Sequence, residues 1–85
     1  MEKTIQQIHL EMTQELIKKA LASPEDDKLF QEVISRVLDY YFTRMELAEE
    51  FAVTLPTVRR WDRGQSDPHP AMRAVLYKHL LSKIE

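Results

Sequence analysis

Apolar residues recur at steps of three and four positions along most of the chain, which is the spacing of amphipathic helices. The pattern predicts five helices, over residues 3–22, 24–42, 44–51, 55–63 and 70–84. The second helix has the strongest stripe and is expected to form the centre of the core; its apolar positions are Phe30, Val33, Ile34, Val37, Leu38 and Tyr41. The stripe of the first helix consists of Ile5, Ile8, Met12, Leu16 and Ala20 and is widened by Leu10, Ile17 and Leu21. That of the last consists of Met72, Val75, Leu76, Leu80 and Leu81.

Capping residues predict where these helices begin and end. Ser23, which a proline follows, is the expected N-cap of the second helix. Thr43 and Glu46 have the spacing of a capping box and are expected to open the third helix. Thr54 is the predicted cap of the fourth helix, and Gly64 is expected to end it.

The composition agrees with a small all-α protein. A chain of 85 residues forms one small fold, which we divide into an N-terminal helix over 1–23 and a domain over 24–85. The single glycine argues against a β-rich fold and against a phosphate-cradling loop. The chain has no cysteine, its three histidines are scattered, and no catalytic triad is recognisable. We therefore expect no metal site, no cofactor and no enzymatic activity.

The chain shows no signal peptide and no apolar run near the roughly 20 residues of a membrane span. Neither secretion nor membrane insertion is therefore expected, and a cytoplasmic location is predicted.

Charge is close to balanced, so only a local patch could attract nucleic acid. The formal net charge is −2; residues 1–43 carry five basic and eight acidic side chains, and residues 44–85 carry seven and six. Three arginines nevertheless fall within the stretch TLPTVRRWDRG, residues 54–64. Val58 and Trp61 are three positions apart and are expected to face the core. The same helical geometry turns Arg59, Arg60 and Arg63 outward.

Two short helices joined by a tight turn are typical of a helix-turn-helix. Residues 46–72, ELAEEFAVTLPTVRRWDRGQSDPHPAM, resemble the Cro/CI-type (Xre-like) helix-turn-helix family. The resemblance covers about residues 26–82 and excludes 1–22. Ala52 departs from the family, which usually has glycine at this turn because the backbone there favours a left-handed conformation. The matching positions are Glu46-Leu47-Ala48, Val53-Thr54, Thr57-Val58, Arg60-Trp61, Gly64, Pro68 and Pro70.

The resemblance implies a five-helix, lambda-repressor-like fold with an extra N-terminal helix. It implies a transcription regulator, usually a repressor, that binds duplex DNA as a homodimer and is found at the nucleoid when bound. The family's base-contacting positions fall on Leu55, Pro56 and Arg60, with Arg59 beside them. Arg60 is suited to a bidentate contact with guanine, whereas Leu55 and Pro56 offer apolar contact to a thymine methyl. The positions that resemble phosphate contacts are Thr43, Arg44, Thr54, Arg63 and Gln65.

Other interpretations of these features stay open. The arginines can form a solvated face that pairs with Glu46, Glu49 or Glu50. A MerR- or excisionase-like DNA binder also suits the arginine stretch. A protein-interaction module, such as an antitoxin or anti-activator, is suggested by the acidic N-terminal half and by the apolar Leu55-Pro56 pair. The N-terminal helix can either pack back on the domain or serve as a dimerisation arm.

Overall fold

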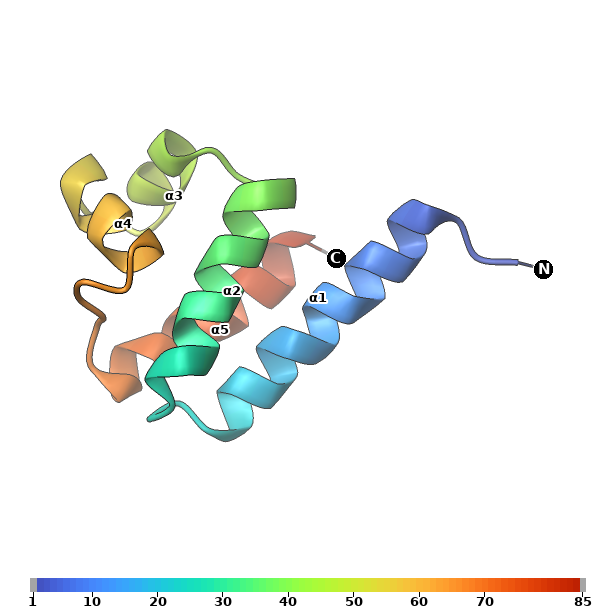
Figure 1. Cartoon of the computed structure of the whole chain (residues 1–85), viewed down its shortest axis with the longest axis horizontal. Coiled ribbons are helices and arrows are strands. Elements are labelled where there is room, and N and C mark those ends of the chain that lie inside the picture. Colours follow the sequence, from blue (N-terminus) through green and yellow to red (C-terminus); the bar gives the residue numbers. More distant parts are fainter. Residues whose placement is uncertain (1, 85) are drawn as a thin grey trace.

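The computed structural model describes residues 2–84 and confirms an all-α fold (Figure 1). α1 and α2 lie side by side and run in opposite directions, and α5 passes behind them. α3 and α4 sit together at one end of the molecule, away from the projecting N-terminal half of α1. The helices are α1 (Ile5–Ala22), α2 (Asp27–Tyr40), α3 (Arg44–Glu50), α4 (Leu55–Asp62) and α5 (Pro70–Ile84).

α2 forms the centre of the core, as its stripe predicts. The helix packs against α1 and α4, and α5 packs on α1. Two positions of the predicted stripe, Leu38 and Tyr41, are half-buried at its C-terminal end. The buried residues of α2 are Leu29, Phe30, Val33, Ile34 and Val37.

The start predicted for α2 is wrong. Ser23 is not its N-cap; the cap is Asp26, whose carboxylate accepts hydrogen bonds from the amides of Lys28 (3.0 Å) and Leu29 (3.1 Å). The first amides of a helix have no partner within it, and a carboxylate that accepts hydrogen bonds from two of them also carries the charge that the positive end of the helix dipole favours. Pro24 lies outside the helix, where its carbonyl oxygen accepts a hydrogen bond from Arg73. The other helix boundaries fall within two residues of the prediction.

The stripe predicted for α1 is correct only in part. Ile17 and Ala20 are buried as predicted, together with Thr13, but Ile5 is 75% exposed and Met12 is 55% exposed. α1 has apolar residues on adjoining faces, and the face that meets α2 and α5 is the one that becomes buried. The buried face fits the hypothesis that the helix packs back on the domain, and the exposed stripe is what a dimerisation arm would use.

A polar contact explains the buried Thr13 between α1 and α2. Its hydroxyl donates to the carbonyl oxygen of His9 (2.8 Å) and accepts from Nε of Arg36 (3.0 Å). The Arg36 guanidinium also contacts Nδ1 of His9 at 3.2 Å and lies 5.0 Å from the ring centroid of Tyr40. Burial of this hydroxyl costs little because it is hydrogen-bonded twice.

The stripe predicted for α5 is correct only in part. Leu76 and Leu80 are buried, but Met72 is 53% exposed and Val75 is 65% exposed. The helix is rotated so that Arg73 and Tyr77 point into the protein instead. Desolvation raises the pKa of the Tyr77 hydroxyl to about 12.

Arg73 is a buried cation that joins three segments of the chain. Its side chain donates to the carbonyl oxygens of Pro68 (2.8 Å) and Pro24 (2.9 Å), and to the carboxylates of Asp27 (2.8 Å) and Asp67 (2.6 Å). The contacts tie α5 to the connection before α2 and to the connection after α4. Only a guanidinium offers enough donors in one plane to reach all four acceptors.

The two carboxylates on Arg73 are not equivalent. The hydrogen bond from Arg73 lowers the pKa of Asp27 below its ordinary value. Desolvation, together with the neighbouring Asp27, raises the pKa of Asp67. Asp67 is the more buried of the two side chains, which accounts for the difference.

We predict that Arg73→Met lowers the free energy of unfolding by about 2–4 kcal/mol, because it leaves two carbonyl groups and Asp67 without their donor. Arg73→Lys, which keeps the charge but cannot span four acceptors, is expected to recover only part of the loss. Urea denaturation of the three proteins measures both effects. Equal stability of wild type and Arg73→Met would show that these contacts do not hold the fold.

Candidate nucleic-acid interface

The connection between α3 and α4 makes the tight turn that the sequence suggests. Ala52 has φ of 53°, which is the left-handed conformation expected at this position. Two backbone hydrogen bonds close the turn. The amide of Ala52 donates to the carbonyl oxygen of Glu49 (3.3 Å), and the amide of Val53 donates to the carbonyl oxygen of Ala48 (3.0 Å). Alanine is strained in this conformation by about 1 kcal/mol, so the surrounding packing must hold it.

The capping box at the start of α3 is confirmed. The Thr43 hydroxyl accepts from the amide of Glu46 (3.1 Å), and the Glu46 carboxylate accepts from the amide of Thr43 (2.9 Å). The backbone hydrogen bond from Thr43 is the main reason that the pKa of Glu46 lies below its ordinary value.

The ends of α4 are also those predicted. Thr54 caps the helix by accepting from the amide of Thr57 (3.2 Å). Pro56 lies in the first turn, where its missing N–H costs little. Beyond the last turn, Gly64 has φ of 69° and lies against the side chain of Gln31. A Cβ at Gly64 would lie 2.8 Å from Nε2 of Gln31, so both the conformation and the space favour glycine.

α4 is held on the protein by its inner face, as predicted. Val58 and Trp61 are both buried. The Trp61 ring packs edge-on against Phe30 of α2, with centroids 5.7 Å apart and planes at 82°. Because Trp61 is a core residue, it is not a free stacking surface for single-stranded nucleic acid.

The C-terminal end of α3 is fixed on α5. The Glu50 carboxylate contacts Nε2 of His79 and lies 3.3 Å from Nζ of Lys83. The His79 hydrogen bond is the main cause of the lowered pKa of Glu50. Phe51 packs edge-on against the His79 ring at 5.4 Å. These contacts fix the position of α3, to which the turn and α4 are joined.

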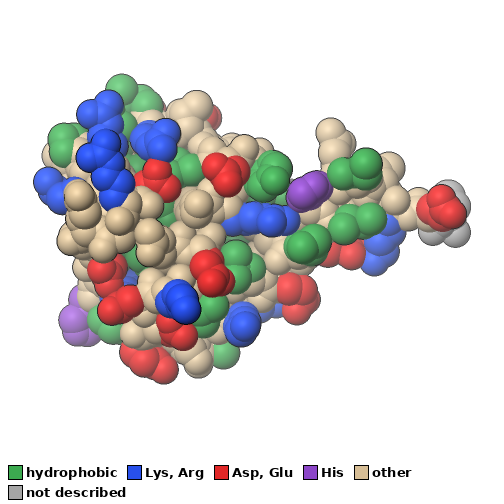
Figure 2. Space-filling view, in the orientation of Figure 1, with side chains coloured by type: hydrophobic (Ala, Val, Ile, Leu, Met, Phe, Trp, Pro, Cys, Tyr) green, Lys and Arg blue, Asp and Glu red, His purple; other side chains and the backbone are tan. Residues whose placement is uncertain are grey.

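The outer face of α4 carries exposed arginines. Arg59, Arg60 and Arg63 are exposed, as is Pro56, while Leu55 is half-buried. Within residues 2–84, none of the three arginines makes an ion pair, so the predicted alternative of pairing with acidic residues of α3 is not observed. Figure 2 shows basic side chains gathered over the end of the molecule formed by α3 and α4, whose basic residues are all arginines.

Arg44 lies beside this face and is oriented by Asp62. Nη2 of Arg44 donates to the Asp62 carboxylate at 2.6 Å, and the Arg44 side chain remains 53% exposed. The contact links the first residue of α3 to the last residue of α4. Gln65, the remaining predicted phosphate contact, is exposed just past α4. Its backbone N–H donates to the carbonyl oxygen of Arg60 (2.9 Å).

Two residues of this face were missed by sequence reasoning. Asp62, which falls among the arginines in the sequence, orients Arg44. Thr57 was treated only as part of a motif, although its hydroxyl accepts from Nη2 of Arg60 at 3.3 Å. The three-residue spacing of Thr57 and Arg60 on a helix is the signal that would have found the second pair.

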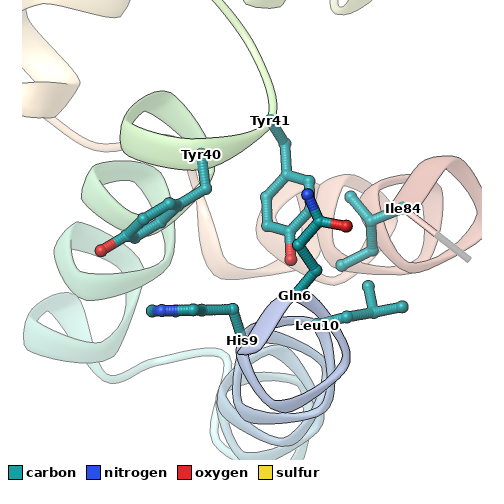
Figure 3. A pocket seen from close by; sticks show the side chains of 6 residues that line it. All are labelled: Gln6, His9, Leu10, Tyr40, Tyr41 and Ile84. Atoms are coloured by element: carbon teal, nitrogen blue, oxygen red, sulfur yellow. The ribbon is translucent and has the colours of Figure 1, made fainter. Parts of the chain in front are cut away.

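The molecule has a separate cleft, of about 410 Å³, at the end of α2 away from α4. Figure 3 shows His9 and Tyr40 close together on one side of it and Leu10 and Ile84 on the other. Gln6 and Tyr41 complete the lining. The described residues contain no cluster of three metal-ligating side chains and no helix with the length and apolarity of a membrane span.

Comparison of the chain with protein-family models, with curated proteins and with solved structures yields no match. The functional interpretation of this face therefore depends on its own residues and geometry.

We predict that Ala52→Gly raises the free energy of unfolding by about 1 kcal/mol, because glycine adopts the left-handed conformation without strain. Ala74→Gly, in the interior of α5, should have the opposite sign and cost about 1 kcal/mol. Chemical denaturation distinguishes the two. A loss of stability in Ala52→Gly would contradict the strain assigned to this turn.

The lowered pKa of Glu46 predicts a pH dependence of stability. The contribution of its carboxylate is complete above the ordinary pKa of 4.5 and is lost as the pH falls through the lower folded-state value. Glu46→Gln, which can still cap the helix, should therefore lose less stability than wild type between about pH 5 and about pH 3. Glu49→Gln, away from the cap, is the control and should follow wild type; the same pH slope in all three proteins would refute the prediction.

Proposed function

We propose that this protein is a transcription regulator that binds duplex DNA in a sequence-specific manner, with α4 in the major groove. The observation that supports this most is the division of α4 into two faces. Val58 and Trp61 hold the inner face, while Arg59, Arg60 and Arg63 are exposed on the outer face without ion pairs within residues 2–84. A cationic helix anchored at the surface by two buried side chains suits insertion into a groove that is flanked by phosphates.

Arg60 is the proposed base-contacting residue, with Arg59 beside it. A guanidinium can donate two parallel hydrogen bonds to the O6 and N7 atoms of guanine. Leu55 and Pro56, in the first turn of α4, have apolar side chains and are proposed to contact a thymine methyl.

Backbone contacts are proposed for residues that flank this helix. Arg63 and Gln65 follow α4, and Arg44 reaches its end through Asp62. The contact with Asp62 uses one N–H of Arg44, so the other guanidinium donors stay available for a phosphate. Thr43 and Thr54 complete the proposed set, although their hydroxyls already accept the capping hydrogen bonds.

The proposed state on DNA is a homodimer that acts as a repressor by occupying its site. α4 has eight residues and is about 12 Å long, so one copy contacts only a few base pairs. Two copies on a two-fold symmetric site would double the number of base pairs contacted. A winged MerR- or excisionase-like module is less well supported, because α5 begins at Pro70, two residues after Pro68, where strands would be expected.

The proposal is tested by selecting a duplex from a random pool and measuring its binding by fluorescence anisotropy. We expect an enriched two-fold symmetric sequence, and an affinity that falls steeply with salt because bound counterions are released. No enriched sequence, together with weak binding at low salt, would reject DNA binding and favour the protein-interaction module.

Two variants are expected to act differently on the selected duplex. Arg60→Ala should lose about 1–3 kcal/mol of discrimination at one base pair. Arg63→Ala, a matched loss of one exposed arginine, should weaken binding to all sequences alike and reduce the salt slope by about one. If both variants weakened binding equally at every base pair, the base-contacting role of Arg60 would be excluded.

A further inference from the structure

A line of hydrogen-bonded side chains runs along α4 from its cap to Arg60. The hydroxyl oxygens of Thr54 and Thr57 lie 2.8 Å apart. Nη2 of Arg60 lies 3.3 Å from the Thr57 hydroxyl. The three residues follow one another at steps of three, so they are neighbours on the helix surface. Thr57 therefore links the capped, ordered end of α4 to an otherwise exposed guanidinium.

The direction of these hydrogen bonds follows from the chemistry of the groups. A guanidinium only donates, so the Thr57 oxygen is the acceptor for Arg60. Either threonine hydroxyl can donate the hydrogen bond between them, and this contact holds the Thr57 side chain against the helix cap. One N–H of Nη2 on Arg60 is used by Thr57, which leaves its second N–H and those of Nη1 free for another acceptor.

We propose that Thr57 is a positioning residue that fixes the guanidinium of Arg60 before DNA arrives, and thereby contributes to base specificity. The inference rests on the proposed function for its link to DNA, but the positioning itself is a property of the free protein. A free arginine side chain has many rotamers, and ordering it opposes binding. A guanidinium held in place loses less freedom when it meets a guanine, and is less able to adapt to another base.

The positioning is tested without DNA by NMR relaxation of the Arg60 Nε–H group. Thr57→Val keeps the β-branched shape but lacks the hydroxyl, and Thr57→Ser keeps the hydroxyl. We expect Arg60 to be ordered in wild type and in Thr57→Ser and mobile in Thr57→Val, while Arg59 is unchanged. Equal mobility of Arg60 in all three proteins would overturn the proposal.

The effect on specificity is measured with the selected duplex and with a duplex altered at the base pair that Arg60 contacts. Thr57→Val should reduce the discrimination between them about fivefold, the scale of one hydrogen bond, and Thr57→Ser should retain it. In the Arg60→Ala background, Thr57→Val should have no further effect on this ratio. Affinity lost equally for both duplexes, or a full effect in the Arg60→Ala background, would assign Thr57 a direct DNA contact or a purely structural role instead.

The two measurements separate this proposal from the function on which it rests. If Thr57 orders Arg60 but no duplex is bound, the proposed DNA binding fails while the positioning stands, and its role in specificity is rejected. If wild type discriminates between duplexes but Thr57→Val neither frees Arg60 nor changes the ratio, DNA binding stands and the positioning is rejected.

Discussion

The direction of α4 depends on one aromatic contact, the edge-on packing of Trp61 against Phe30. Phe30 is itself held from another side by the Arg73 guanidinium, which lies 5.4 Å from its ring centroid. Arg73 in turn bonds to the segments before α2 and after α4. This series of contacts connects α4 to the centre of the core. It lets an eight-residue helix, too short to be stable alone, keep a defined orientation.

The arginines of α4 gain their importance from placement and not from the total charge. The protein has a net charge of −2, yet three acidic side chains near this end have other partners. Glu46 caps α3, Glu50 contacts α5, and Asp62 orients Arg44. Arg59 and Arg60 are exposed and make no ion pair within residues 2–84. A near-neutral protein can in this way present a local cationic surface, as the proposed groove binding requires.

Structural features that depend only on neighbouring residues in the chain could be predicted from the sequence. The stripe of α2 and the caps at Thr43 and Thr54 are of this kind. The left-handed turn at Ala52 was expected only from the resemblance to a known family. Features that depend on distant partners could not. Which face of α1 is buried depends on α2 and α5, and the buried Arg73 depends on acceptors up to 49 positions away. The cap of α2 was misplaced because Asp26, and not Ser23, accepts hydrogen bonds from the first amides of the helix. Pro24 lies outside the helix, and its carbonyl oxygen accepts from Arg73.

The most direct test of the proposed interface is an NMR titration of the isotope-labelled protein with a short duplex that carries the selected site. Groove binding through α4 predicts that amide shifts concentrate in residues 43–45 and 54–65, with the Arg60 side-chain resonance among those that change most. The exposed stripe of α1 and the cleft beside Tyr40 should be affected only where two copies touch. Shifts confined to α1 or α5, with residues 54–65 unchanged, would contradict the assignment of α4 as the DNA-binding helix.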